Sequence, residues 1–260
     1  MAGTAKMAVW LLLLLVQMVA VMGLVGPQGR FKSGVVQLAM NLGPQFVTRT
    51  KPNTPSLILI SGCTGTGKST FGMEVAIQKG ILKCISTDTI RQTLRTVDGT
   101  PALHRSSFQG ENDPIIDWRE TCSVLEKAID SIVFDCLRRG SSLVLEGVHI
   151  VPQRRLIDEW NKAGGFAVGA VLKIPDAETH RKVIFRRGEQ TGKGADAQIE
   201  KFNRIRAIHD EMVRLGRDTD WLLIEQRPLL APNPLMMLNE FIEQQEVTKG
   251  ATGGSQERFL

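Results

Sequence analysis

Nine consecutive residues carry the strongest chemical signal in the chain. Residues 62–70 read Gly-Cys-Thr-Gly-Thr-Gly-Lys-Ser-Thr, which fits the phosphate-binding pattern G-x-x-x-x-G-K-[ST]. Glycines let the backbone turn tightly and aim its N–H groups at phosphate oxygens. A lysine brings a compact charge to the outer phosphates, and a serine hydroxyl suits a magnesium ion held against them. The residues expected to hold the phosphates are Gly62, Thr64, Gly65, Thr66, Gly67, Lys68, Ser69 and Thr70, with Ser69 also a metal ligand.

The sequence on both sides of this loop supports the same interpretation. The apolar run 57–60 precedes the loop and is typical of a buried parallel strand. Residues 71–77 follow it with the pattern of a helix, whose positive N-terminal end would also face the phosphates. A glycine-rich turn that matches by accident would not be expected to have both neighbours.

Polar residues follow the next two predicted strands. Asp88 ends the second strand, with Arg91 one turn later, and Glu146 and His149 end the third. Ligands of parallel sheets lie beyond the carboxyl ends of the strands. We therefore expect Glu146 to orient magnesium or its water, and Asp88 to orient or deprotonate an acceptor hydroxyl. Arg91 and His149 would hold an acidic acceptor.

Each of these residues also has a plainer interpretation. Asp88 could simply cap a helix over 89–95, and His149 could be a packed or solvent-facing side chain. Arg91, Arg186 and Arg187 could be solvated helix charges, although their clustering at the predicted phosphate end favours binding. The segment 186–196 holds three glycines and several charges, so we interpret it as a mobile lid. Arg186 and Arg187 of that lid would be catalytic, because they would offset charge on the transferred group. Lys68 of the phosphate loop would have the same role.

The elements that must position these residues alternate along the chain. Apolar periodicity predicts one long helix over 113–138, ended by Gly140, because Trp118, Cys122, Leu125, Ile129, Ile132 and Cys136 recur every three or four residues. Strands are predicted over 57–60, 83–86, 142–145, 166–174 and 221–224. Further helices are predicted over 152–163, 176–185, 199–215 and 233–245, with a polar loop over 98–109. This alternation predicts an α/β fold with a parallel sheet of about five strands and helices on both faces. Together with the phosphate loop and the arginine-bearing lid, it predicts a P-loop NTPase.

Composition sets the class of the protein. The 260 residues are 42% hydrophobic and 23% charged, which are globular values. A net charge of +5 suits a protein that handles several phosphates and is too weak to indicate nucleic-acid binding. The four cysteines show no C-x-x-C spacing, so we expect free thiols and neither a disulfide framework nor a zinc site.

Four further stretches of the sequence form a specific combination: Ile85-Ser-Thr-Asp-Thr-Ile-Arg91, His104-Arg-Ser-Ser-Phe108, Val144-Leu-Glu-Gly-Val-His-Ile-Val-Pro152 and Phe202-Asn-Arg-Ile-Arg-Ala-Ile-His209. Together they resemble the 2-phosphoglycerate kinase family and its plant relatives linked to phytic acid accumulation. The resemblance runs from about Ser56 to Glu246, and Phe108 stands where the family is expected to carry tyrosine. It implies a kinase that uses ATP and Mg²⁺ to phosphorylate a small acidic phosphorylated acceptor, 2-phosphoglycerate or a similar compound.

The resemblance also implies roles for particular residues. Asp88 and Arg91 would face the acceptor, and Arg186 or Arg187 would close over the transferred group. Two alternatives stay open: a kinase for inositol phosphates or polynucleotide ends, and a membrane-anchored nucleotide-binding regulator with little turnover. The presence of Asp88, Glu146 and the paired arginines favours a working kinase.

The N-terminal part has a different character. Residues 7–25 are almost entirely apolar after Lys6, as in a signal-peptide core or signal anchor. The first acidic residue of the chain is Glu74, so residues 24–55 are basic and acid-free, like a transit peptide. Together they resemble the two-part presequence of plastids of secondary origin. The alternatives are an uncleaved membrane anchor with the kinase domain facing the cytosol, and a buried core helix.

We therefore expect three parts: a targeting presequence or signal anchor with a linker over 1–55, the kinase domain over 56–246, and a disordered tail over 247–260. Membrane contact would be made through residues 7–25.

Overall fold

A five-stranded, entirely parallel sheet organises the chain in a computed structural model that describes residues 54–106, 108, 112–191, 201–226 and 233–253. These residues belong to one compact unit, Asn53–Leu260. The strand order is β2-β3-β1-β4-β5. The predicted α/β fold with about five parallel strands is therefore confirmed.

The three central strands are short apolar runs buried from both sides, as expected of a parallel sheet covered by helices, whereas the edge strands β2 and β5 are mostly half-buried. β1 places its residues between β3 and β4, with Leu59 opposite Leu145 on one side and Gly169 on the other. The central position of β1 puts the phosphate loop at the point where the strand order reverses, where α/β sheets bind ligands. The bounds are β1 Ser56–Gly62, β2 Cys84–Ser86, β3 Leu143–Gly147, β4 Phe166–Lys173 and β5 Leu222–Glu225.

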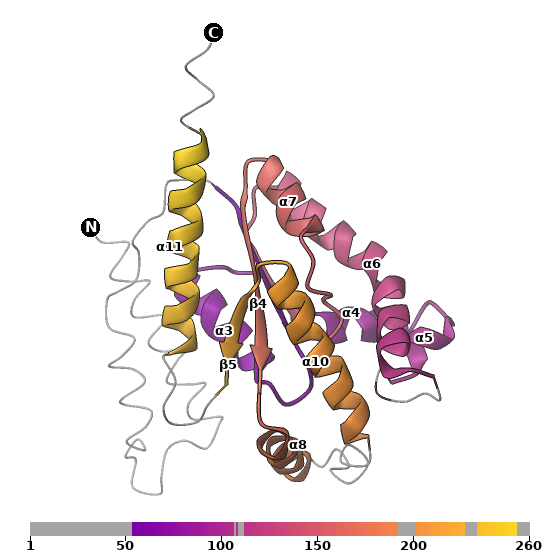
Figure 1. Ribbon diagram of the computed structural model, residues 1–260. Helices are drawn as coiled ribbons and strands as arrows, with labels where there is room; N and C mark the ends of the chain where they lie inside the picture. The colour runs from indigo at the N-terminus through magenta and orange to yellow at the C-terminus, as the bar shows by residue number, and fades with distance from the viewer. Residues whose placement is uncertain (1–53, 107, 109–111, 192–200, 227–232, 254–260) are drawn as a thin grey trace, which may run out of the picture. The chain divides into compact units, whose positions relative to one another are not determined.

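Alternate residues of β1 divide the core into two layers. Leu57 and Leu59 pack with the side covered by α4, α6, α7 and α10, whereas Ile58 and Ile60 pack with α3 and α11. Figure 1 shows α3 and α11 on one side of the sheet and α6, α7 and α10 on the other. The helices are α3 Lys68–Lys79, α4 Thr87–Leu94, α5 Pro101–His104, α6 Pro114–Arg138, α7 Arg155–Lys162, α8 Ala177–Thr191, α10 Phe202–Asp218 and α11 Pro234–Gly253.

The first residues of β1 are anchored by the neighbouring strand and α7. The Pro55 carbonyl accepts hydrogen bonds from Phe166 N (2.9 Å) and from the Trp160 indole (2.9 Å). A side chain on Gly165 would collide with that indole, because its Cβ would lie 2.3 Å from Trp160 Nε1. Pro55, one residue before the strand begins, is thus tied to both β4 and α7.

The long helix α6 follows the prediction closely. The Asp113 side chain caps it by accepting from Ile115 N and Ile116 N, and Pro114 occupies the first turn, where its missing N–H costs nothing. Its buried face includes Trp118, Cys122, Leu125, Ile129 and Cys136, with Val133 buried in place of the half-buried Ile132. All four cysteines are free thiols, as predicted.

Two predicted loops contain helix. The short helix α5 lies inside the predicted polar loop 98–109, because Pro101 has the backbone angle of a first helical turn. Helix α8 continues to Thr191, so the prediction that a loop begins at residue 186 was wrong for residues 186–191. A helix tolerates the single Gly188, which is buried. The rest of the predicted lid, residues 192–196, lies outside the described residues.

The final helix also extends further than predicted. Helix α11 reaches Gly253, beyond the expected end at residue 245, so residues 247–253 of the predicted disordered tail are helical. Residues 253 and 254 are both glycine, the residue that most often ends helices. In the parts of the chain that the structure describes, no helix is both long and apolar enough to cross a membrane. The apolar stretch 7–25 lies outside those parts.

Candidate active site

The phosphate loop connects the end of β1 to the start of α3. Gly65 (φ 84°) and Gly67 (φ 77°) adopt left-handed backbone conformations that other residues rarely tolerate. Gly67 is the residue before α3, so the free N–H groups of the first helical turn face the loop. The buried Thr66 hydroxyl donates to the Cys63 carbonyl (2.9 Å), which closes the loop on itself. The side chain of Thr66 therefore supports the loop from within.

A cavity of about 100 Å³ opens beside this loop. It brings together predicted site residues from four places: the loop, α4, the segment after β3, and α8. Three further lining residues, Ser106, Phe108 and Val148, had no predicted site role, although all three belong to stretches that carry the family resemblance. The lining residues are Thr64, Lys68, Ser69, Asp88, Arg91, Ser106, Phe108, Val148, His149 and Arg187.

The predicted magnesium residues meet at the edge of this cavity. The Ser69 hydroxyl donates to Glu146 Oε1 (3.1 Å). Glu146 is only 3% exposed, and its other oxygen, Oε2, has no hydrogen-bond partner among the described residues. No cluster of three or more His, Cys, Asp or Glu suited to a metal occurs in the described part of the chain. One hydroxyl and one carboxylate fit magnesium, which usually keeps several waters and phosphate oxygens as ligands.

Asp88 is free to act in the cavity because another residue caps its helix. Ser86 is the N-cap of α4, and its hydroxyl accepts from Asp88 N (3.2 Å), so the alternative that Asp88 caps the helix was wrong. The Asp88 side chain is 66% exposed and lies 3.6 Å from His149 Nδ1. Asp88 thus presents a carboxylate to the cavity from the first turn of α4.

His149 is buried behind Asp88. Its Nδ1 lies 3.2 Å from the Thr87 hydroxyl, and burial lowers the pKa of the imidazole far below its usual value. The backbone reaches this place through Gly147, where a Cβ would lie 1.7 Å from Thr87 Oγ1. Trp118 fixes the same segment by donating its indole N–H to the Val148 carbonyl (2.7 Å). His149 therefore lines the cavity as a rigid, neutral ring.

Arg91 has a structural task as well as a place in the cavity wall. Its guanidinium donates to the carbonyls of Leu103 (Nε, 2.9 Å), Ala102 (Nη2, 3.4 Å) and Arg105, at the end of α5. Burial lowers the pKa of Arg91 to about 10, and the nearby charge of Arg95 acts in the same direction. The Arg91 guanidinium therefore has two roles: it lines the cavity, and it holds the end of α5 in position.

The two adjacent arginines of α8 diverge. Arg187 lines the cavity with Lys68 and Asp88. Arg186 lines a separate hollow with Arg181, Lys182 and Phe185. Successive residues of a helix are about 100° apart around its axis, so only one of the two arginines can face the phosphate loop. Of the two predicted catalytic arginines, the structure places Arg187 at the site.

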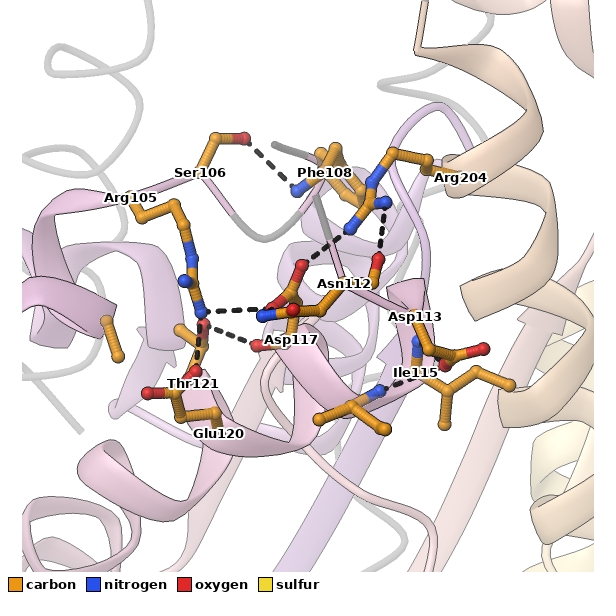
Figure 2. A network of polar contacts seen from close by, with 12 residues as sticks. Arg105, Ser106, Phe108, Asn112, Asp113, Ile115, Asp117, Glu120, Thr121 and Arg204 are labelled. Atoms are coloured by element: carbon orange, nitrogen blue, oxygen red, sulfur yellow. Dashed lines mark hydrogen bonds and ion pairs between the residues drawn. The ribbon is translucent and has the colours of Figure 1, made fainter. Parts of the chain in front are cut away.

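A buried ion-pair network supports the wall formed by Ser106 and Phe108. Asp117 is fully buried at the start of α6 and accepts from Arg204 Nη2 (2.6 Å) of α10, and its other oxygen lies 3.2 Å from Arg105 Nη2. Figure 2 shows Arg105 and Arg204 approaching Asp117 from opposite sides, with Ser106 and Phe108 between them. Arg105 also pairs with Glu120 (2.5 Å). The network ties the cavity wall to two helices and was not predicted.

The remaining predicted residues take supporting places. Gly62 ends β1, where a Cβ would lie 2.6 Å from Thr66 Oγ1. Thr70 is exposed in the first turn of α3 and does not line the cavity. A larger cavity of about 180 Å³ lies between α6 and the segment leading into α7, and His149 lines both cavities. The phosphate loop does not reach the larger one.

The assembled groups can perform phosphoryl chemistry. Loop N–H groups, Lys68 and Arg187 supply positive charge around one small volume, and the carboxylate of Asp88 faces the same volume. Phosphoryl transfer depends on positioning and charge neutralisation more than on covalent chemistry, and these groups supply both.

Comparison with known proteins agrees with this chemistry. A family model described as "AAA domain" matches residues 57–212, which is more than half of the chain. The 2-phosphoglycerate kinase of Methanocaldococcus jannaschii is 29% identical over 174 residues, covering 63% of this chain and 56% of that protein. The 2-phosphoglycerate kinase of Pyrococcus horikoshii is 27% identical over 212 residues, covering 77% and 69%. This chain thus spans little more than half the length of the first of these relatives.

Proposed function

We propose that this chain, which belongs to the AAA domain family, transfers the γ-phosphoryl group of ATP to the hydroxyl of a small acidic phosphorylated acceptor, 2-phosphoglycerate or a close analogue. The observation that carries the proposal is the shared cavity, in which Lys68 and Ser69 of the phosphate loop face Asp88 and Arg187. The similarity to 2-phosphoglycerate kinases supports the acceptor class.

The residues divide the work between charge and proton transfer. The loop N–H groups and Lys68 hold the β- and γ-phosphates, and Arg187 offsets charge on the transferred group. As the acceptor oxygen bonds to the γ-phosphorus, the bond between that phosphorus and the oxygen bridging to the β-phosphate breaks. The electron pair of the broken bond leaves with ADP. The hydroxyl proton passes to Asp88, whose exposed carboxylate lies in the cavity.

Magnesium would be held by Ser69 and by Glu146, directly or through a water. Glu146 Oε2 is buried and has no hydrogen-bond partner within the described structure. Its lone pairs are therefore available to the ion or to a water bound to the ion. When bound there, the ion would help to neutralise the charge that develops on the phosphate oxygens.

The acceptor side of the cavity favours a small anion. Arg91 and the neutral His149 lie beside Asp88, and Phe108 also lines the cavity. An arginine fork suits a carboxylate or phosphate group on the acceptor. The similarity to 2-phosphoglycerate kinases supports such a compact acceptor over an inositol polyphosphate or a polynucleotide end.

A phosphotransfer screen tests the proposal. The purified full-length chain is incubated with Mg²⁺ and ATP labelled in the γ-phosphate, together with 2-phosphoglycerate, 3-phosphoglycerate, inositol phosphates or a 5′-hydroxyl oligonucleotide. Label should pass to a phosphoglycerate.

Lys68→Ala should lower the rate by at least about 100-fold through loss of a transition-state charge contact. Lys79→Ala, at the other end of the same helix, should leave the rate unchanged. Transfer to none of these acceptors, or undiminished transfer by folded Lys68→Ala, would refute the proposal.

A further inference from the structure

We infer that His180 is a positioning residue that couples helix α8, and with it Arg187, to the phosphate loop. The inference rests on the proposed function for the role of Arg187, and it adds a residue that no sequence pattern indicated. His180 lies in the second turn of α8, whereas the loop precedes it by more than 100 residues.

The contact between them is a directional hydrogen bond. His180 Nε2 lies 2.8 Å from the Thr64 carbonyl, and the His180 side chain is fully buried. A carbonyl oxygen can only accept, so Nε2 carries the proton and Nδ1 is bare. Nδ1 is itself buried without a hydrogen-bond partner in the described structure. Burying a ring nitrogen without a hydrogen-bond partner costs free energy. An apolar side chain would avoid that cost if packing were the only requirement at this position.

The same face of α8 continues the contact toward the cavity. Gly65 leaves no spare room, because a Cβ there would lie 3.1 Å from Ile184 Cγ1 and 3.5 Å from His180 Cδ2. Arg187 follows one turn later and lines the cavity. Residues at positions i, i+4 and i+7 share one face of a helix. His180, Ile184 and Arg187 therefore form a single row along the phosphate loop.

Helix α10 holds the other side of the imidazole. The Phe202 ring meets His180 edge to face with a centroid distance of 5.6 Å, and the His209 ring lies 5.2 Å away. His209 Nε2 accepts from Ile174 N (3.0 Å), and Arg206 donates to the Ile174 carbonyl (2.7 Å). These bonds fix the segment between β4 and α8. With both its entry and its second turn fixed, α8 has one orientation relative to Thr64, and that orientation brings Arg187 to the site.

The experiment separates positioning from mere packing. His180→Phe keeps a ring of similar shape but removes the donor, whereas His180→Gln keeps an N–H at a comparable reach. Affinities for ADP and for a non-hydrolysable ATP analogue are measured with Mg²⁺ by calorimetry, and unfolding is followed for every variant. We expect His180→Phe to weaken binding of the ATP analogue about tenfold, because α8 is no longer held against the phosphate loop, and His180→Gln to recover most of the loss.

A double-mutant cycle on the analogue affinity tests the coupling to Arg187. Arg187→Ala should cost much less in the His180→Phe background than in the native one, because the helix no longer presents the arginine. Arg186→Ala is the matched control, and its effect should be the same in both backgrounds. If His180→Phe does not fold, the cycle is measured with His180→Gln and with His180→Asn, whose N–H reaches less far. Arg187→Ala should then cost less in the His180→Asn background than in the His180→Gln background.

The outcomes distinguish this inference from the proposed function. Additive effects of His180 and Arg187, or native analogue affinity in folded His180→Phe, would overturn the inference. A native chain that binds ATP but transfers phosphate to no acceptor would count against the proposed function alone, since the cycle is measured by binding. A native chain that binds no nucleotide would overturn both.

Discussion

Ser69 and Glu146, which are 77 residues apart in sequence, share a hydrogen bond of 3.1 Å between the first turn of α3 and the end of β3. The second carboxylate oxygen of Glu146 is buried and finds no partner within the described residues. Unpaired buried carboxylate oxygens are costly, so the pair is poorly satisfied until a cation or an ordered water reaches it.

Replacing Glu146 by glutamine should therefore raise the Mg²⁺ concentration needed for half-maximal activity. Loss of a group that orients a metal or its water typically costs about 10–100-fold in metal affinity or activity. The measurement is a titration of phosphotransfer with Mg²⁺ at fixed ATP. Glu126→Gln serves as a control because Glu126 pairs with Arg155 on the exposed side of α6. An unchanged magnesium requirement in Glu146→Gln would remove Glu146 from the metal site.

The substitution Asp88→Asn should lower kcat much more than it weakens ATP binding. The amide keeps the size of the side chain but cannot accept the acceptor's proton. Because Ser86 caps α4, Asp88→Asn should change the free energy of unfolding little, whereas Ser86→Ala should cost about 1 kcal/mol and leave kcat near normal. Comparison of kcat, nucleotide Kd and unfolding for the two variants tests this assignment. A normal kcat in Asp88→Asn would contradict it.

Arg91→Ala should raise the acceptor KM and spare the ATP KM. Arg91 lines the cavity, but it also holds carbonyls at the end of α5, so some loss of stability is expected as well. Arg95→Ala provides the matched control, because Arg95 Nε donates to the same Leu103 carbonyl (2.6 Å) and does not line the cavity. Steady-state kinetics should show an acceptor effect for Arg91→Ala only. If ATP binding suffers instead, Arg91 belongs to the nucleotide half of the site.

Stability should fall as the pH drops below about 6.5. Burial is the main cause that lowers the pKa of His149, His180 and His209, the last to about 4. The unfolded chain therefore takes up protons before the folded chain does, and the stabilisation present above pH 6.5 is lost progressively toward pH 4. For His209 the full loss is on the order of 3 kcal/mol.

Urea unfolding at several pH values measures this dependence. His209→Gln can still accept from Ile174 N but cannot become charged, so its stability should depend less steeply on pH than that of the native chain. His104 is exposed on α5, and His104→Gln should leave the dependence as it was. Equal slopes in the native chain and His209→Gln would contradict the prediction.

We propose that residues 1–55 direct the chain to a plastid or, alternatively, hold it on a membrane. The apolar stretch 7–25 and the acid-free segment 24–55 motivate the proposal. A reporter fused after Pro55 should reach an organelle or stay membrane-bound. A mature N-terminus near residue 24 or later would support import, and an intact N-terminus in the membrane fraction would support an anchor. A freely soluble, uncleaved cytosolic product would contradict both.

Local patterns were sufficient to predict many of the residues that line the candidate site. Lys68 and Ser69 follow from a contiguous motif, and Asp88 and His149 follow from the rule that parallel strands present their ligands at one edge. Both kinds of inference need only short stretches of sequence and the alternation of strands and helices. Glu146 could be placed in the same way, because it ends the predicted third strand.

Residues whose role depends on distant partners could not be predicted in this way. His180 and Thr64 are 116 residues apart, and Arg204 and Asp117 are 87 apart, so nothing local indicates that they meet. The choice between Arg186 and Arg187 depended on the phase of α8, which could not be determined while that stretch was predicted to be a loop. Tertiary packing, and not local propensity, decides these positions.

The double anchor on Pro55 limits how the N-terminus can be processed. Its carbonyl joins β4 and α7 to the start of the central strand, so a protease that cut after this residue would remove the acceptor of two hydrogen bonds. The Phe166 amide and the Trp160 indole would then lose that partner beside the core. If residues 1–55 hold a cleaved leader, as proposed above, cleavage before Pro55 would keep both hydrogen bonds, so the proposal places the processing site before this residue.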